Sequence, residues 1–367
     1  MKKIYYITAV FATLFLVGCG DGIDLPGVNV ETDLNKIPLP DNNVNLEQVE
    51  LKPSTEPMLH EGLHTEEDFQ RIRDKKAAGE EPWISAYQLL VESQFSQKTA
   101  DTYPTEWIKR GVSGDENYMN AARGATIAYQ QALRWKIEQD DEYAAKAVEN
   151  LNKWVQTCVG VTGNTNLSLA AGLYGYEFAI AGELLRDYGG WDRADFAAFQ
   201  NWLLKVFYPA NDDFLKRHHD TNALHYWANW CLCNIAAKMA IGIVTDRRDI
   251  YNEGIAHLQT GDTNGRLRRA IYHDYAPDYN FAQWQESGRD QGHTLMCVGL
   301  MGVICQLAWS QGDDFFAYDD NLFLRACEYA ACCNYTNETV PYTTYIWQKQ
   351  SQWGYPIPEE QTTLGGG

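Results

Sequence analysis

The sequence predicts an all-α protein folded as an (α/α) toroid, and three observations favour this fold class. From about residue 59 onward, apolar residues recur at helical spacing, and hardly any stretch alternates with a period of two. Short polar breaks separate the helical segments, as is typical of antiparallel helical hairpins. No sequence repeat of fixed period is present, which argues against a consensus solenoid. We therefore expect one domain of helical hairpins over residues 59–367.

The N-terminus predicts an export signal. Lys2 and Lys3 precede an apolar run over residues 4–17, which is too short to span a membrane. The run ends in the sequence LVGC, typical of a bacterial lipoprotein, so residues 1–18 are the expected signal peptide and Cys19 the lipidation site. We expect a lipid anchor in the outer membrane, on its periplasmic or outer side; ordinary secretion is the alternative. Residues 19–58 are polar and proline-containing, which predicts a tether.

The helices can be placed in chain order from their start and stop signals. Thr65 begins a capping box, and Phe69 and Ile72 follow it at helical spacing. A second helix follows Pro82, and a third covers residues 118–139. Asp140 ends that helix and precedes a new helix through residue 154. Further helices are expected over residues 167–187, 193–206, 221–244, 248–259, 290–311 and 320–333. No helix is predicted beyond residue 345, so the toroid is expected to be open or to lack its last helix.

Composition and charge narrow the function. The chain carries a net charge of −19, which makes it a poor nucleic-acid binder and excludes that class of protein. An anionic substrate would also be repelled by this field, so a cleft that binds one is expected to be locally basic. The 12 Trp and 22 Tyr are numerous enough to build sugar-stacking surfaces, although aromatic packing between helices would use them equally well.

The cysteines do not predict a metal site. Apart from Cys19, eight cysteines fall in apolar, helix-like stretches and none forms a CxxC pair. They are predicted to be small buried hydrophobic residues, although an exported protein permits a disulfide. We expect neither a metal nor an organic cofactor.

Asn222, His225 and Trp227 form the first candidate site, shortly after His219. The predicted helix over residues 221–244 would place Asn222 and His225 on one face, because they are three residues apart. An amide and an imidazole together can hold a carboxylate. The alternative is that both groups are buried and bonded by neighbouring backbone.

Glu286, Arg289 and His293 form the second candidate site. Their spacings of three and four residues would place them on one face at the start of a long apolar helix. Ser287, Gly288 and Gly292 are poor residues for a helix interior, which favours a helix N-terminus at this point. The alternative is a surface salt bridge of small energetic value.

Two further segments carry candidate residues. The basic, tyrosine-rich loop over residues 266–279 includes Arg269, Tyr272 and Tyr275, any of which could act as charge clamp, acid or base, although a solvated basic loop is equally consistent with the pattern. Residues 172–177 place Tyr174 and Tyr176 beside two glycines inside a helical pattern. Those glycines indicate close approach by another group, which could be a second helix.

These motifs resemble those of a known family. Residues 222–230, followed by residues 246–249, resemble the Asn-Asn-His-x-Tyr-Trp helix of alginate lyases, and Glu286-x-x-Arg289 resembles their Glu-x-x-Arg step. Residues 63–66 and 290–293 are similar to one branch, polysaccharide lyase family 38. The resemblance covers roughly residues 59–346.

The resemblance implies an (α/α) toroid that cleaves a uronic acid polymer, either alginate or a glucuronan, by β-elimination to 4,5-unsaturated oligosaccharides. It implies that Asn222, His225 and Arg289 hold and neutralise the substrate carboxylate, with His225 also a candidate base. We further expect Glu286, Trp227, Tyr174, Tyr176 and Arg269 to contact the substrate. The expected partner is an anionic polysaccharide, with membrane contact only through the lipid anchor.

The sequence departs from the family pattern in two places. Ala223 and Leu224 separate Asn222 from His225, so His219 is a second candidate for the family's histidine position. Met296 occupies the position where alginate lyases carry a catalytic tyrosine. The proton donor is therefore expected to be His293, Tyr272 or Tyr275.

Two other functions fit parts of the sequence. A glycoside hydrolase on the same fold would need two carboxylates facing one bond, and Glu177, Glu183, Glu286 and Asp290 are available. A non-catalytic, glycan-binding lipoprotein would need only the aromatic side chains. The cluster of Glu286, Arg289 and His293 favours an enzyme over a binding protein.

Overall fold

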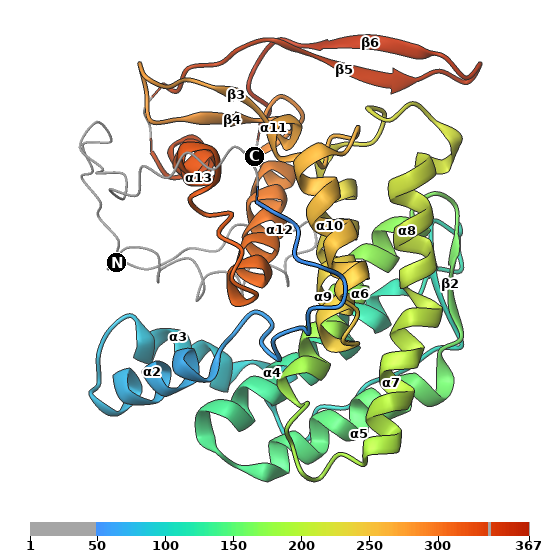
Figure 1. The fold of residues 1–367 in the computed structure, drawn as a ribbon, viewed down its shortest axis with the longest axis vertical. Coiled ribbons are helices and arrows are strands. Elements are labelled where there is room, and N and C mark those ends of the chain that lie inside the picture. The colour runs from blue at the N-terminus through green and yellow to red at the C-terminus, as the bar shows by residue number, and fades with distance from the viewer. Residues whose placement is uncertain (1–48, 337–338, 367) are drawn as a thin grey trace.

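A computed structural model describes residues 49–336 and 339–366, and its helices form an open arc (Figure 1). Four helices line the inside of the arc and pack side by side: α4 (Tyr118–Glu138), α6 (Leu167–Leu184), α9 (Ala228–Val244) and α12 (Gln291–Ser310). Outer helices cover them: α5 (Asp141–Thr157), α7 (Arg193–Val206), α8 (Tyr208–Arg217), α10 (Arg248–Thr260) and α13 (Tyr318–Tyr335). The prediction of hairpins of long helices is confirmed.

Short helices lie at one end of the arc and beside α9 and α10. α2 (Glu66–Ala77), α3 (Trp83–Glu92) and the 3-10 helix η2 (Gln94–Ser96) pack near α4, and the predicted capping box of Thr65 and Asp68 is present. Asp140 caps α5 by accepting a hydrogen bond from the Glu142 amide at 3.0 Å. A 3-10 helix, η3 (His218–Asp220), precedes α9, and α11 (Leu267–Ala270) follows α10.

The inner helices run in the same direction, so their N-terminal ends lie together. Asn234 of α9 donates to the Ser168 carbonyl of α6 at 3.2 Å, and the start of α12 lies beside the start of α9. Gly172 allows α6 to approach α9, because a Cβ there would lie 2.4 Å from the Cys233 Sγ. The predicted close approach is therefore confirmed, by a helix at Gly172 and by Phe207 at Gly175.

The inner helices are apolar on most sides because both flanks are covered by other helices. By length and composition α12 would be long enough to cross a membrane, but most of its residues are buried inside the fold. It is therefore the core helix of a packed domain. The eight cysteines that the structure describes are all free, and six are buried, as predicted for small hydrophobic residues.

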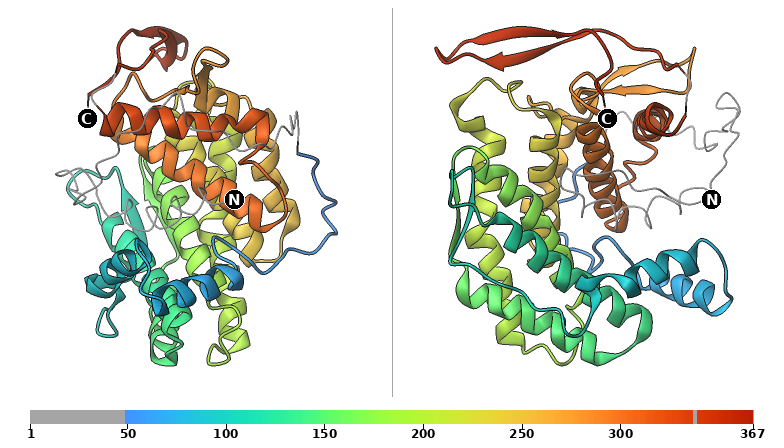
Figure 2. Two further views of the ribbon diagram at one scale, coloured as in Figure 1. Left: turned by 90° about the vertical axis from the view of Figure 1, so that its left-hand side faces the viewer. Right: turned by 180° about the vertical axis from the view of Figure 1, so that it is seen from behind.

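Three pairs of short strands were not predicted. β1 (Trp107–Arg110) pairs with β2 (Gly160–Gly163) in parallel, and β3 (Ile271–Asp274) pairs with β4 (Ala282–Trp284) antiparallel. β5 (Tyr345–Gln350) and β6 (Pro356–Gln361) form an antiparallel hairpin near the chain's end. Figures 1 and 2 show this hairpin lying across one end of the helical arc.

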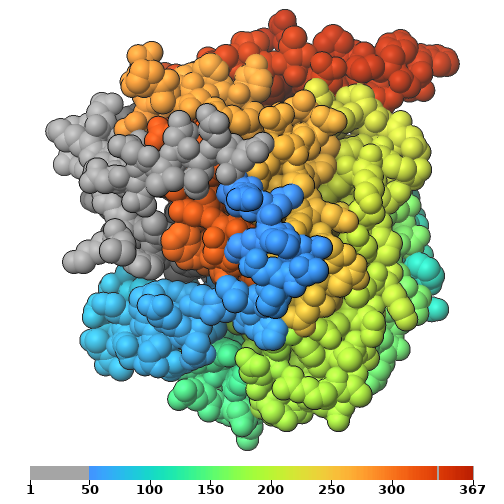
Figure 3. Space-filling view, viewed as in Figure 1, coloured from blue at the N-terminus to red at the C-terminus, as the bar shows by residue number. Residues whose placement is uncertain are grey.

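Residues 49–64, which we call the N-terminal strap, run across one face of the arc towards α2 (Figure 3). The Lys52 carbonyl accepts from Asn252 at 2.7 Å, and the Pro57 carbonyl accepts from Arg248 at 2.7 Å. Gln311, just after α12, donates to the Leu59 carbonyl at 3.0 Å. The strap thus joins α10 and α12 to the start of the arc, and residues 49–58, predicted as tether, pack on the helical body. The signal peptide and Cys19 lie outside the described residues.

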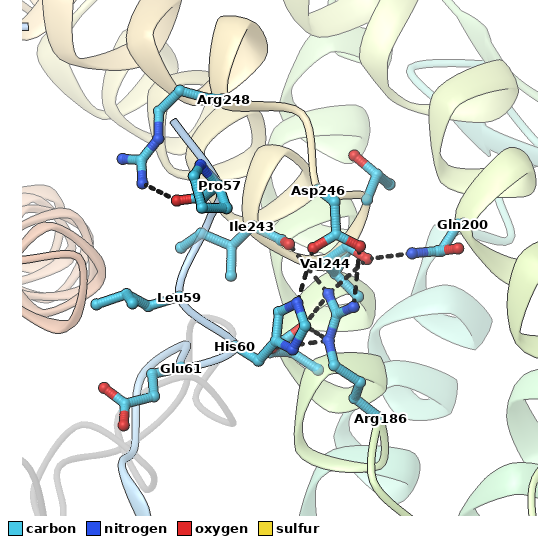
Figure 4. Close-up of polar contacts among 12 residues, drawn as sticks. Pro57, Leu59, His60, Glu61, Arg186, Gln200, Ile243, Val244, Asp246 and Arg248 are labelled. Atoms are coloured by element: carbon cyan, nitrogen blue, oxygen red, sulfur yellow. Dashed lines mark hydrogen bonds and ion pairs between the residues drawn. The ribbon is translucent and has the colours of Figure 1, made fainter. Parts of the chain in front are cut away.

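A buried arginine organises the opposite end of the inner helices (Figure 4). Arg186 contacts Glu183 at 2.8 Å and Asp246 at 3.1 Å, and it donates to the last carbonyls of α9. His60 of the strap reaches the same Asp246 at 3.0 Å. This polar cluster fixes the strap to the C-terminal end of α9, far from the hairpin end.

Candidate active site

The first candidate segment is a turn and not the predicted helix. α9 begins at Ala228, so residues 222–227 precede it, and the expectation that Asn222 and His225 share a helical face is wrong. The reason is local: the Asn222 Oδ1 accepts a hydrogen bond from the Leu224 amide at 3.1 Å, which closes an Asx turn. Trp227 has an extended backbone at the N-cap of α9.

The second candidate segment also lies mostly before its helix. α12 begins at Gln291, and Asp290 is its N-cap, accepting from the His293 amide at 2.7 Å. Glu286 and Arg289 occupy the preceding turns, so the expected single helical face is wrong here too. The expected contact is nevertheless made, because the Arg289 Nη1 lies 3.2 Å from the Glu286 Oε2.

Side chains of the second segment cap the helix that follows the first. The Ala228 amide donates to the Gln285 Oε1 at 3.0 Å, and the Asn229 amide donates to the Glu286 Oε1 at 2.9 Å. Glu286 is fully buried; burial raises its pKa, and Arg289 and the Asn229 amide oppose that rise. Glu286 therefore fixes Arg289 to the N-terminal end of α9.

A series of stacked groups links the two segments through the hairpin. The His225 ring lies 6.0 Å from the Trp347 ring, and Trp347 stacks on Trp227 with centroids 4.5 Å apart. The Arg289 guanidinium lies 5.3 Å from the Trp227 centroid, within the range of a cation–π interaction. Arg289 is thus held on one side by a carboxylate and on another by an aromatic ring.

Gln350 of β5 makes further contacts with the first segment. Its Oε1 accepts a hydrogen bond from the Asn222 side chain at 2.8 Å, and its backbone N–H donates to the His225 Nδ1 at 2.8 Å. Burial lowers the pKa of His225, and Lys349 lowers it further. In this structure Asn222 and His225 bind the hairpin through Gln350. Their role in binding a substrate carboxylate stays a prediction.

The hairpin also contacts the second segment. The Tyr345 hydroxyl donates to the Gln285 carbonyl and accepts from the Gly288 amide at 3.2 Å. A Cβ at Gly288 would lie 2.5 Å from the Tyr342 hydroxyl, so this close approach requires glycine. The hairpin therefore ties together two segments that are about sixty residues apart in sequence.

Asp290 and His293 form a dyad beside Arg289. The His293 Nδ1 lies 2.7 Å from the Asp290 Oδ2, while the Arg289 Nε lies 3.7 Å from the same oxygen. A carboxylate that accepts the Nδ1 proton fixes the imidazole tautomer in which Nε2 is the basic nitrogen. This arrangement would suit His293 to accept a proton from a group bound beside Arg289.

The two predicted tyrosines have different environments. Tyr272 is 41% exposed, and its ring lies 4.9 Å from Tyr345, next to the loop that carries Arg289. The Tyr275 hydroxyl instead bonds to Gln283 at 2.5 Å and Thr343 at 3.1 Å, and burial raises its pKa. Of the two, Tyr272 presents the more accessible hydroxyl.

Other predicted residues have structural roles. Tyr174 and Tyr176 are buried, with 5% and 2% of their surface exposed, so most of each side chain packs inside the fold, and their contact with substrate stays a prediction. Arg269 donates to the Asp262 carbonyl in its own loop. The His219 Nε2 lies 2.9 Å from the Ser168 hydroxyl, and burial lowers the pKa of that histidine.

Sequence reasoning missed Trp347, Gln350 and Tyr345 as members of this site, and it missed Gln285 as a helix cap. Asp290 was noted only as a carboxylate, although the N-cap preference of aspartate could have placed it at the helix start. Residues 345–350 lie more than 120 residues from Asn222, and nothing in their local pattern indicates that contact. Within residues 49–336 and 339–366, no group of three or more His, Cys, Asp or Glu side chains is placed to hold a metal ion.

The fold and the site define an (α/α)-toroid enzyme whose polar groups gather at the N-terminal ends of the inner helices. The sequence matches the alginate lyase family over residues 73–338, and the chain belongs to this family. No curated protein sequence matches the chain.

Solved structures support the same fold. An alginate lyase A1-III variant in complex with a tetrasaccharide superposes with a TM-score of 0.54 at 15% identity, covering 75% of this chain and 79% of that one. A1-III from Sphingomonas species A1 gives a TM-score of 0.50 at 14% identity, over 76% and 80% of the two chains. An alginate lyase from Bacteroides ovatus gives a TM-score of 0.50 at 14% identity, over 73% and 81%. The predicted (α/α) toroid is confirmed.

Proposed function

We propose that this protein is a polysaccharide lyase that cleaves a uronic acid polymer, alginate or a glucuronan, by β-elimination. The observation that carries the proposal is the pairing of Arg289 and His293 through Asp290, beside Trp227. One group is a fixed cation and the other a fixed base. Removal of the proton next to a carboxylate needs both.

Arg289 supplies the cation for the substrate carboxylate. Its Nη1 contacts Glu286 and its Nε faces Asp290, while Nη2 has no partner among the residues that the structure describes. The N-terminal ends of α9 and α12 lie beside it, and each contributes roughly half a positive charge. This local field opposes the net charge of −19 of the whole chain.

His293 and Tyr272 supply the proton transfers in this proposal. The His293 Nε2 removes the C5 proton of the uronate while Arg289 stabilises the charge that spreads onto the carboxylate. The Tyr272 hydroxyl then protonates the leaving O4. Each positioned transfer contributes roughly 10²–10⁴-fold in rate.

Two finer assignments belong to the same proposal. Residues 63–66 and 290–293 support placement in the polysaccharide lyase family 38 branch. The sequence of residues 1–19 supports export and a lipid anchor at Cys19 in the bacterial outer membrane. An enzyme anchored there would meet its polymer outside the cytoplasm.

Contacts already occupy three of the four carboxylates that the hydrolase alternative would use. Glu183 is bonded to Arg186 at the opposite end of the inner helices, and Glu286 is fully buried as the cap of α9. Asp290 is bonded to His293. Each of these three carboxylates already has a cationic or imidazole partner, which leaves no facing pair for hydrolysis among them.

The experiment is to incubate the full chain with alginate, polymannuronate and glucuronan and to follow the ultraviolet absorbance of the unsaturated product. Arg289→Ala should reduce that signal by at least about 10²-fold, because a fixed charge donor is lost at the reacting centre. Arg217→Ala is the matched control: Arg217 lies exposed on α8, bonded to Asp213. Unchanged activity in folded Arg289→Ala would refute the proposal.

A further inference from the structure

Arg110, the last residue of β1, carries a charge that no described carboxylate balances. Its guanidinium lies 4.7 Å from the centroid of the Tyr118 ring, and its Nη1 is buried without a hydrogen-bond partner. By contrast Arg186 and Arg289 both form ion pairs. Arg248, Arg266 and Arg325 also each have one buried nitrogen without a hydrogen-bond partner. Such a nitrogen is costly, because its lost hydration is not replaced.

Arg110 lies where the N-terminal ends of three inner helices meet. Tyr118 is the first residue of α4, and its ring stacks on Tyr174 of α6 at 6.5 Å and 11°. Burial raises the pKa of Tyr174 and of Cys233 of α9, and the Arg110 charge opposes both rises. The Asn229 amide of α9 bonds to Glu286. Cys233 lies four residues later, about 6 Å further along α9.

Glu177 follows Tyr174 by one turn of α6 and also has an unsatisfied polar atom. Its Oε2 is buried without a hydrogen-bond partner. Gly175 packs on Phe207 beside the outer helices, and Glu177 is about 200° further round α6, so it faces the inside of the arc. Burial raises the pKa of Glu177 to about 8, so its carboxyl group is mostly neutral at pH 7 and does not repel an anion.

We propose that Arg110 and Glu177 form a second sugar-binding subsite, in which Arg110 binds the carboxylate of a further uronate residue and Glu177 hydrogen-bonds a ring hydroxyl. The inference rests on the proposed lyase function and extends it to substrate length. Both side chains lie close enough to Tyr174 to shift its pKa, Arg110 downward and Glu177 upward. The enzyme therefore requires a run of uronate residues and not a single one.

The test uses mannuronate oligosaccharides of increasing length with the full chain. We expect Arg110→Ala to raise KM about 10–100-fold on longer oligosaccharides, as for loss of a charge-assisted hydrogen bond, with kcat changed less than about threefold. Arg110→Lys should restore part of the affinity. Glu177→Ala should raise KM roughly 2–10-fold, while Glu177→Gln, which keeps a donor and an acceptor, stays near wild type. Arg217→Ala is the charge-matched control.

The outcomes separate this inference from the proposed function. If Arg289→Ala abolishes cleavage while Arg110→Ala and Arg217→Ala have equal KM on every length, the lyase function stands and the second subsite is refuted. If the wild-type protein cleaves no uronate polymer, the same oligosaccharides are titrated by calorimetry. Weaker binding to folded Arg110→Ala than to Arg217→Ala then supports the subsite, and equal binding overturns it. Thermal melts confirm that each variant folds.

Discussion

Glu286→Gln tests whether the buried carboxylate positions Arg289. The substitution keeps the size of the side chain, and an amide oxygen can still accept from the Asn229 amide. The amide NH2 group, however, would face the Arg289 guanidinium in place of the Oε2 that now lies 3.2 Å away. Two donors then oppose each other, and the ion pair is lost.

The expected magnitude follows from the environment of the pair. A hydrogen bond to a charged group contributes about 1.5–3 kcal/mol, and breaking a buried ion pair costs more. The Arg289 side chain is 28% exposed, so water replaces part of the lost contact. We expect a loss of about 1–2 kcal/mol in the free energy of unfolding and a fall in kcat/KM of about 10–100-fold.

Urea denaturation followed by tryptophan fluorescence measures the stability, and initial rates on alginate measure the activity. Glu67→Gln, on the exposed side of α2, is the control for the change of charge. Repeating the substitution in an Arg289→Ala background gives the coupling energy of the pair. Strictly additive effects on stability, or wild-type kcat/KM in Glu286→Gln, would refute the positioning role.

Two other predictions concern stability at low pH and the hairpin. Burial lowers the pKa of His64, His218 and His257 to about 4, so the stability they contribute is present above pH 6.5 and is lost as the pH falls from 6.5 to 4. Unfolding near pH 5 should take up about two protons more than at pH 7.5, and an unfolding free energy independent of pH over this range would contradict it. Trp347→Ala should remove the circular-dichroism signal of stacked indoles and lower kcat/KM about 10-fold, because the ring that supports Trp227 is lost. Trp353→Ala, 74% exposed at the tip of the same hairpin, should leave both unchanged; equal effects of the two substitutions would count against the stack.

The helices themselves were predictable because their signals are local. The sequence places a helix over residues 193–206, and α7 has those bounds. Thr65 and Asp140 cap the helices that their residue types predict. A helix that buries one face needs an apolar residue about every 3.6 positions. This pattern is therefore present in the sequence whichever element the helix packs against.

The site depended on contacts that the sequence pattern does not contain. Residues 222–227 continue the apolar pattern of α9, yet the helix begins at Ala228, where Gln285 and Glu286 satisfy the first amides from another part of the chain. The functional residue types were therefore identifiable, but their backbone conformation was not.

The sequence alone determined the family, the helical fold and the residue types near Arg289. Only the tertiary structure placed the β5–β6 hairpin over both candidate segments, stacked Trp347 on Trp227, and left Arg110 without a carboxylate. The physical reason is range. Helix formation is decided within a few residues, whereas the position of a charged side chain relative to its partners is decided by packing between segments that can lie more than 100 residues apart.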